Sequence, residues 1–334
     1  MKKKIAFIDH NFHQKTRSGD FLREILKREF SIDDYWWSFR NKYNLINDVK
    51  QYDYFFFFQS LLPLEDLLKI KDKQIIWAPM YDNLDKSKNF WKKIKFLNIK
   101  ILSFSDPIKK LCEKYGCNYL SLKFAKKEKF IKSKNKKKVN IFFWYRNNVS
   151  IYDWIDCFNI KDINQILYLD RPDPGRESEK INSQDLRKYK IKLIKKDFFS
   201  KTKYLKLIKN CDVFVCSRKQ EGIGMSFIEA LAMGKYLIFH NDYTMKEYVK
   251  DKKIGLSIPR NLSKKINTTL ILKSYKYRYF HAIDLYNNWS KNKNKLIEFC
   301  NNNRKSDVNN PIYYFYFLKD YLKKIKFYFD NLLT

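Results

Sequence analysis

Short runs of consecutive apolar residues alternate, in the first third of the chain, with stretches in which apolar residues recur every three or four positions. Consecutive apolar residues predict buried strands, and the wider spacing predicts amphipathic helices. A polar loop is predicted from His10 to Ser18. Strands separated by helices of this length indicate βαβ units on a parallel sheet. The predicted strands are residues 5–9, 54–58, 74–78 and 99–104, and the predicted helices are residues 21–30, 64–70, 88–97 and 106–115.

A second alternation of the same kind follows in the middle of the chain. Its predicted strands are residues 139–144, 165–169, 191–194, 212–216 and 236–240. Two successive halves of this kind predict an α/β chain with two Rossmann-like domains, followed by a helical, basic and aromatic segment. The predicted parts are a first domain over residues 1–122, an exposed basic connection over 123–138, a second domain over 139–260 and the helical segment over 261–334.

The excess of positive charge favours three classes of binding partner. Lys and Arg number 69 against 36 Asp and Glu, so the formal net charge is +33 at pH 7. A field of this size attracts nucleic acid, anionic lipid headgroups or phosphorylated small molecules, and the charge alone does not choose among them. The hydrophobic content of 45% is enough for packed cores and excludes wholesale disorder.

The apolar stretches and the cysteines indicate the cellular compartment in which the protein is expected. The apolar run at residues 5–8 ends at Asp9 and is too short for the core of a signal peptide. The longest apolar stretches, residues 54–64 and 311–318, are shorter than the roughly 18–20 residues that a spanning helix needs. The 6 cysteines show neither a CxxC pair nor metal-ligand spacing. We therefore expect a cytoplasmic, reduced protein with no metal.

The most informative segment runs from Asp212 to Phe239 and reads DVFVCSRKQEGIGMSFIEALAMGKYLIF. An apolar strand leads through a polar loop with two glycines into a predicted helix that ends before Gly234. A helix N-terminus presents unpaired N–H groups and a partial positive charge, and glycines let an anion approach it. Glu221 and Glu229 can accept sugar or ribose hydroxyls beside that anion. The segment predicts a nucleotide-sugar site, and the alternative is a plain βαβ unit with two surface glutamates.

Glu221 to Glu229 also matches the E-x7-E motif of retaining glycosyltransferases of the GT-B fold, and EGIGMSFIEALAMGK resembles the EGFG…EAMACG signature of glycosyltransferase family 4. The resemblance implies two Rossmann-like domains whose parallel sheets face a cleft, with ligands at the carboxyl ends of the strands. It also implies a retaining, metal-independent transfer of a hexose-type sugar from a nucleotide-diphosphate donor to a glycan or lipid-linked glycan. Residues 10–13, 79–82 and 142–146 look like features of a bacterial subfamily near surface-polysaccharide loci.

The family implies a role for each residue that matches its motif. Glu229 would bind the ribose hydroxyls of the donor, and Glu221 would contact hydroxyls of the transferred sugar. Arg146 stands where the family keeps a phosphate-binding arginine, which would neutralise the charge that builds on the departing nucleoside diphosphate. The donor diphosphate would be received by the backbone amides around Gly222, Ile223, Gly224 and Met225.

The sequence departs from the family pattern at two places. The family often keeps a lysine about five residues after the arginine, but Ser150 and Ile151 stand there, so Arg218 or Lys219 would have to supply that charge. The glycine pair of the first N-terminal loop is reduced to Gly19.

Histidines and one aspartate complete the candidates. His10 or His13 could orient the acceptor or take part in proton transfer, or they could be loop residues with no role. Asp82 is placed to meet an acceptor hydroxyl, and His240 follows a predicted strand of the second domain. The segment from Arg171 to Gly175 follows another strand and is either a turn or part of the donor site.

Two other functions remain open: a nucleic-acid-binding protein that uses the basic surface, and a glycosyltransferase-like scaffold without activity. Against the first, we find no zinc, helix-turn-helix or RNA-recognition pattern, so no nucleic-acid partner is expected. Residues 313–328 interleave aromatic residues with lysines, which is typical of a helix in a bilayer interface. We therefore expect peripheral association with an anionic surface at the inner face of the cytoplasmic membrane, with a last helix packed into the protein as the alternative.

Overall fold

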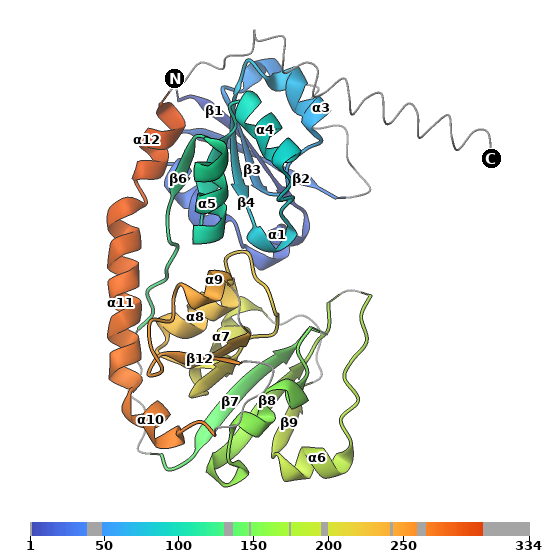
Figure 1. Ribbon diagram of the computed structural model, residues 1–334, viewed down its shortest axis with the longest axis vertical. Helices are drawn as coiled ribbons and strands as arrows, with labels where there is room; N and C mark the ends of the chain where they lie inside the picture. Colours follow the sequence, from blue (N-terminus) through green and yellow to red (C-terminus); the bar gives the residue numbers. More distant parts are fainter. Residues whose placement is uncertain are drawn as a thin grey trace, which may run out of the picture. The chain divides into compact units, whose positions relative to one another are not determined.

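The computed structural model describes residues 2–38, 49–129, 136–146, 148–173, 175–194, 200–240, 243–258 and 265–302. Its contacts divide the chain into two units, shown with their elements in Figure 1. Unit 1 comprises residues 1–122 together with the chain from Asn292 onward, and unit 2 comprises residues 123–291.

Unit 1 is built on a parallel sheet of six strands in the order β2-β1-β3-β4-β5-β6. The chain passes from β1 to one neighbour, β2, and then returns to the other side of β1 to form β3. The point between β1 and β3 is therefore a topological switch point, where open α/β sheets bind ligands beyond the carboxyl ends of their strands. The strands are β1 (Lys4–His10), β2 (Ser31–Trp37), β3 (Tyr54–Gln59), β4 (Gln74–Pro79), β5 (Lys100–Ser103) and β6 (Tyr119–Ser121).

Helices on both faces bury the apolar strands of this sheet. Aromatic side chains fill much of the core, including the stacked rings of Phe7 and Phe56, whose centroids are 4.9 Å apart, and the fully buried Trp91. The α-helices of unit 1 are α1 (Phe12–Thr16), α2 (Asp20–Leu26), α3 (Leu64–Leu67), α4 (Lys88–Phe96), α5 (Asp106–Tyr115) and α12 (Lys295–Asn301). Its 3₁₀ turns are η2 (Val49–Gln51), η3 (Leu68–Ile70) and η4 (Tyr81–Asn83).

Helix α12 returns to unit 1 although the chain before it belongs to unit 2. The fully buried Lys100 of β5 donates from Nζ to the carbonyl oxygens of Phe299 (2.9 Å), Cys300 (3.0 Å) and Asn302. The last carbonyls of a helix have no partner within the helix and carry partial negative charge, which a cation stabilises. Lys100 therefore caps α12 against the sheet of unit 1, where Figure 1 shows it.

Unit 2 repeats the architecture with the parallel order β12-β11-β10-β7-β8-β9. The chain adds β8 and β9 on one side of β7 and then crosses to add β10 on the other. The switch point of unit 2 therefore lies between β7 and β10. The strands are β7 (Val139–Tyr145), β8 (Ile163–Asp170), β9 (Ile191–Ile194), β10 (Val213–Val215), β11 (Tyr236–His240) and β12 (Gly255–Ile258).

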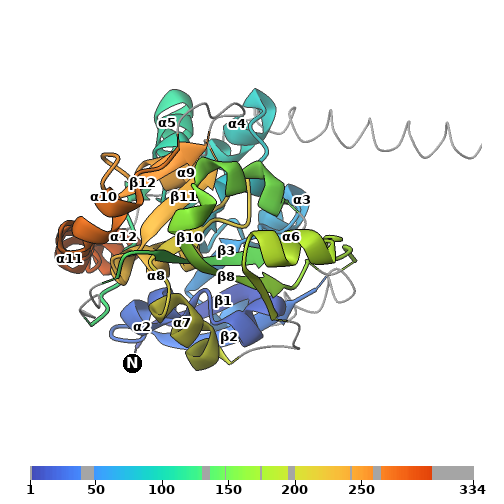
Figure 2. The ribbon, with the colours of Figure 1, turned by 90° about the horizontal axis from the view of Figure 1, so that it is seen from below.

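The helices of unit 2 include the neighbouring pair α7 and α8, seen from below in Figure 2. The longest helix, α11, is anchored by the buried Arg278, which donates from Nε to the carbonyl oxygen of Gly234 at 2.8 Å. The α-helices are α6 (Ser183–Lys188), α7 (Lys201–Lys209), α8 (Met225–Ala232), α9 (Tyr243–Lys246), α10 (Thr268–Lys273) and α11 (Tyr275–Asn292). The 3₁₀ turns are η5 (Ile151–Asp153), η6 (Ile155–Cys157) and η7 (Ile160–Asp162).

The structure confirms the predicted alternation, and Gly234 with φ +70° ends α8 as predicted. Two predictions need correction, and three strands were missed. The predicted polar loop after β1 contains the short helix α1, and the edge strands β2, β6 and β12 were not predicted. The connection after residue 122 was predicted to be exposed, but Phe124 and Ala125 are buried because they pack in unit 2, where Phe124 lies edge-to-face on Trp289.

Across the described part of the chain, no helix is both long and apolar enough to cross a membrane. Within the same residues no group of three or more His, Cys, Asp or Glu side chains could hold a metal ion, and the cysteines are buried free thiols. The residues predicted to lie on a bilayer, 313–328, are outside the described part.

Candidate functional site

Two arginines meet on one carboxylate at the switch point of unit 2. Arg146 follows β7, and Arg218 lies in the loop after β10. Arg146 donates from Nε to Oδ1 of Asp173 at 2.7 Å and its Nη2 lies 2.6 Å from the same oxygen, while Nη2 of Arg218 donates to Oδ2 at 2.9 Å. The three side chains are partly exposed, so two guanidinium groups and one carboxylate leave a net positive site that an anion can reach.

Two nitrogen atoms at this edge of the sheet are buried without a hydrogen-bond partner among the described residues. They are Nε of Arg218 and Nε2 of His240, the last residue of β11. Burial lowers the pKa of His240, and Lys219 adds to the shift, whereas Asp153 opposes it. Strands β11, β10 and β7 are neighbours and parallel, so their carboxyl ends lie at one edge. Buried polar atoms without partners are costly in isolation and are commonly satisfied by a ligand or water.

The predicted glycine loop leads directly into α8. Gly224 has φ +72° and precedes the first helical residue, Met225, with no side chain capping the helix at that position. The left-handed conformation favours glycine, and a Cβ at Gly224 would lie 3.7 Å from that of Glu221. Gly222 and Ile223 are buried, whereas Met225 is partly exposed. The start of α8 thus presents backbone N–H groups next to the partly exposed Glu221.

Glu229 is fully buried in α8 and binds two lysines. Nζ of Lys126 lies 2.7 Å from Oε1, and Nζ of Lys201 lies 2.6 Å from Oε1 and 2.7 Å from Oε2. Burial, followed by the nearby Glu229 carboxylate, raises the pKa of Tyr204. A carboxylate has about four lone-pair positions, so Glu229 keeps capacity for a further hydroxyl donor.

The structure brings some of the predicted charged residues of unit 2 together with partners. Arg146 and Arg218 are brought together by Asp173, whereas Lys219 is exposed in the same loop. Glu229 is engaged by lysines that the sequence did not single out. Lys201 carried no sequence signal, because it is one of many lysines on an amphipathic helix. Asp173 did carry a sequence signal, since it belongs to the polar turn that follows a predicted strand.

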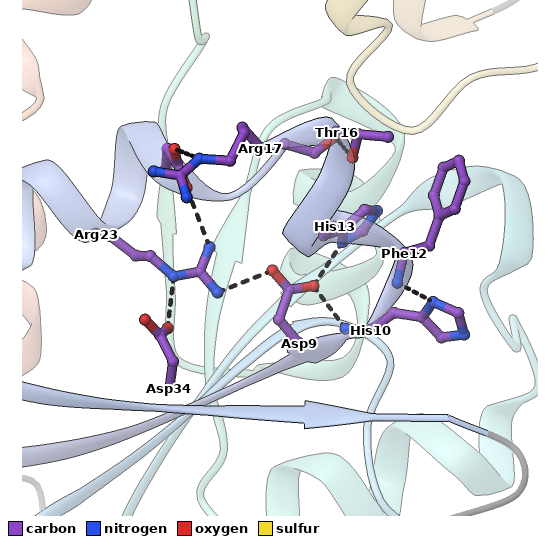
Figure 3. A network of polar contacts seen from close by, with 10 residues as sticks. Asp9, His10, Phe12, His13, Thr16, Arg17, Arg23 and Asp34 are labelled. Carbon is purple, nitrogen blue, oxygen red and sulfur yellow. Dashed lines mark hydrogen bonds and ion pairs between the residues drawn. The ribbon is translucent and has the colours of Figure 1, made fainter. Parts of the chain in front are cut away.

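A separate polar network surrounds the carboxyl end of β1 in unit 1 (Figure 3). Asp9 is fully buried and accepts at Oδ1 from Nδ1 of His13 at 2.5 Å and from the backbone N–H of His10 at 2.7 Å. Nη2 of Arg23 donates to Oδ2 at 3.1 Å. Asp9 and Arg23 were missed as functional residues, although a carboxylate directly after an apolar strand is a signal that could have found Asp9.

Asp82 lies in the turn η4 after β4 and is partly exposed. Its Oδ2 accepts from Nδ2 of Asn83 at 3.5 Å, at the limit of a hydrogen bond. The role of Asp82 as an acceptor contact stays a prediction.

Residues 175–296 match the family model described as "Glycosyl transferases group 1". The match includes Glu221, the glycine loop and Glu229, and it begins after Arg146 and Asp173. A comparison with curated proteins finds no match.

Solved structures are similar over most of the chain. A glycosyltransferase from Rickettsia africae ESF-5 has a TM-score of 0.58 at 13% identity, covering 90% of this chain and 100% of that chain. Sucrose-phosphate synthase from Thermosynechococcus elongatus has a TM-score of 0.60 at 11% identity, with 89% and 98% covered. Anabaena HepE in complex with UDP and glucose has a TM-score of 0.56 at 10% identity, with 89% and 100% covered.

At these identities the likeness shows the fold. The chain has the GT-B fold, an α/β architecture with two Rossmann-like domains. Within that fold, residues 175–296 are the part that matches the family model of the group 1 glycosyl transferases.

Proposed function

We propose that this protein is a glycosyltransferase that moves a hexose-type sugar from a nucleotide-diphosphate donor to a glycan or lipid-linked glycan in bacterial surface-polysaccharide synthesis. The observation that carries the proposal is the pair of arginines on Asp173 at the switch point of unit 2, of which Arg218 lies in the loop that leads to the start of α8 at Gly224. Arginine side chains and helix N-termini are both suited to binding phosphate oxygens. Arg218 and the start of α8 lie within the residues that match the glycosyl transferase model, and Arg146 precedes them.

Each part of the donor has a matching group in unit 2. The diphosphate is received by the first N–H groups of α8 and by Arg146 and Arg218. Glu229 accepts the ribose hydroxyls, and Glu221, beside the start of α8, accepts hydroxyls of the transferred sugar. HepE, a structural neighbour, binds UDP and glucose, so uridine donors are the first to be tested on this chain.

The proposed transfer retains the anomeric configuration and uses no metal. Bond cleavage places negative charge on the departing diphosphate, and two guanidinium groups in a partly buried site can stabilise that charge. Retention rests on the resemblance of the Glu221 to Glu229 motif to that of retaining enzymes. Product NMR, through the coupling constant at the anomeric carbon, measures it directly.

The proposed donor site is tested with variants of its two glutamates. Glu229→Ala is expected to weaken binding of the nucleoside diphosphate, and Glu221→Ala is expected mainly to lower turnover. Each change removes one or two hydrogen bonds to a charged acceptor, worth roughly 1.5–3 kcal/mol apiece. The measurement is the rise in melting temperature given by nucleoside diphosphates, together with the transfer rate from the donor that binds.

Glu177→Ala is the matched control, because Glu177 is an exposed carboxylate of unit 2 with no contact among the described residues. Since a ligand that binds the folded state stabilises it by RT ln(1 + [L]/Kd), the wild-type protein and this control should show the same rise in melting temperature at the same ligand concentration. Wild-type binding and transfer in both glutamate variants would show that the motif is not the donor site.

We further propose that the protein associates peripherally with the inner face of the cytoplasmic membrane, where a lipid-linked acceptor resides. The net charge of +33 supports this, since each lysine near an anionic surface adds about 1 kcal/mol. The protein is expected to float with vesicles that contain anionic lipid at low salt, and not with neutral vesicles. A protein that stays unbound in both cases while acting on soluble acceptors would contradict the proposal.

A further inference from the structure

The segment of unit 2 that carries Asp173 joins β8 to α6, and its start is tied to strand β7. The backbone N–H of Arg171 donates to the carbonyl oxygen of Tyr145 at 3.3 Å, and Nε1 of Trp144 donates to the carbonyl oxygen of Arg171 at 2.9 Å. Trp144 and Tyr145 are the last residues of β7, the strand that pairs with β8 and leads to Arg146. The pairing of these two strands therefore brings Asp173 beside Arg146.

The far end of the same segment is held by Glu179. Its Oε2 accepts from the hydroxyl of Tyr168 at 2.8 Å and from the backbone N–H of Ile151 at 3.3 Å, and its Oε1 accepts from the hydroxyl of Ser150. Tyr168 belongs to β8, and Ile151 begins the turn η5 that follows β7. Hydrogen bonds to a carboxylate are stronger than those between neutral groups, so these three contacts restrain the segment that carries Asp173.

The carboxylate of Asp173 is shared by two arginines from different segments of unit 2. Its Oδ1 accepts from Nε of Arg146, and its Oδ2 accepts from Nη2 of Arg218. Arg146 has a second support, because its guanidinium lies 4.8 Å from the ring centroid of Trp144. Among the residues that the structure describes, Arg218 has no other hydrogen-bond or ion-pair partner. The direction of the Arg218 guanidinium therefore depends on Asp173.

Both arginines keep donors that Asp173 does not use. A guanidinium is planar and has more N–H groups than the contacts to Asp173 occupy, so holding one side of the group also fixes the direction of the other. One carboxylate between two guanidinium groups leaves a net positive charge that can attract an anion. Donors that are aligned before the reaction stabilise developing charge without a cost of reorganisation.

We propose that Asp173 is a positioning residue that holds the guanidinium groups of Arg146 and Arg218 in the directions in which they stabilise the departing diphosphate. In the proposed transfer the diphosphate leaves with the electron pair of its bond to the sugar, and the two arginines meet that charge. Asp173 stays ionised and does not contact the reacting atoms. This inference rests on the proposed function and adds the residue that aligns its two arginines.

The test is Asp173→Asn in the full chain. The amide oxygen can replace Oδ1 and accept from Arg146, but the amide NH₂ then faces Nη2 of Arg218 and can only donate. The variant therefore releases Arg218 while it keeps Arg146. The measurement is release of nucleoside diphosphate from the nucleotide sugar that most raises the wild-type melting temperature. We expect kcat to fall about tenfold and the donor KM to stay within about threefold.

Arg218→Ala shows whether Asp173 acts through Arg218. Its kcat is expected to fall at least as far, and Asp173→Asn should cause no further loss in that background, because no second guanidinium remains to be aligned. Glu177→Gln is the matched control, since it removes one negative charge from an exposed position of the same segment. This control should keep the wild-type kcat and KM.

An Asp173→Asn protein with kcat within about twofold of wild type would overturn the proposal. So would a double variant in which the two losses multiply, because Asp173 would then act independently of Arg218. A merely structural role would lower the melting temperature of Asp173→Asn without ligand, and the loss would persist when Arg218 is alanine.

Arginine NMR tests the alignment without turnover. Exchange between the ¹⁵Nη signals measures rotation of a guanidinium, which slows when its N–H groups are held. Rotation of Arg218 is expected to be slow in the wild-type protein and about tenfold faster in Asp173→Asn, with Arg146 unchanged. Rotation of Arg218 that is equally fast in both proteins would overturn the proposal. If instead no nucleoside diphosphate raises the wild-type melting temperature, the proposed function fails, whatever the rotation rates.

Discussion

Replacing Arg146 with alanine is expected to slow sugar transfer by a factor of about 100 or more while leaving the fold intact. The side chain follows β7 at the switch point, contacts Asp173 through Nε and Nη2, and packs with its guanidinium 4.8 Å from the ring centroid of Trp144. These contacts hold a planar fork of donors at the edge where the diphosphate is proposed to leave. Without the Arg146 guanidinium, only Arg218 and the start of α8 remain to stabilise the charge that develops on the leaving group.

Arg146→Lys is expected to recover part of the lost rate, because a lysine restores the charge but not the two parallel donors. The measurement is kcat under donor saturation, with the nucleoside-diphosphate thermal shift reporting binding separately. Glu177→Gln, an exposed change in the same unit, should leave both unchanged. An Arg146→Ala protein with wild-type turnover would transfer the leaving-group role to Arg218, and Arg218→Ala would then be the variant that loses turnover.

Replacing Lys100 with methionine is expected to lower the free energy of unfolding of unit 1 by about 3–5 kcal/mol. The buried Nζ of Lys100 donates to three carbonyl oxygens at the end of α12. Methionine has a similar length and fills the space, but it cannot donate, so those carbonyls lose a charged partner in a buried environment. Urea unfolding followed by circular dichroism measures the change.

Lys88→Met is the matched control, since Lys88 is exposed at the first position of α4 with no contact among the described residues. Its unfolding free energy should stay within about 0.5 kcal/mol of wild type. Equal stability of the Lys100 and Lys88 variants would mean that water satisfies the end of α12 once Lys100 is gone.

The central strands were predictable because they are buried on both faces. Such strands need a continuous apolar run, as in β3 and in residues 141–145 of β7, and that run can be recognised in the sequence alone. Edge strands are different, since one side of the strand has no neighbour and the faces are less covered. Strand β2 lies at the edge of its sheet and contains polar residues, so it was not recognised as a strand from the sequence.

The glycine loop and Glu229 could also be recognised from the sequence, because they depend on local features of the chain. A helix that starts directly after Gly224 and ends before Gly234 depends on local backbone conformation, which neighbouring residues determine. The partners of the site residues were not visible, because Asp173 and Lys126 reach Arg146 and Glu229 only after the sheet has brought distant segments together. No spacing rule connects such residues.

The sequence by itself therefore determined the parallel α/β architecture in two halves and the loop that begins α8, since both follow from periodicity and local backbone preference. Only the tertiary structure decided which charges meet. It placed the carboxylate of Asp9 on His13 and Arg23, and it returned α12 to unit 1 through Lys100, 199 residues from Phe299 along the chain. Such pairings depend on strand order and crossover, which bring together groups far apart in the sequence and bury them where an unpaired charge is costly.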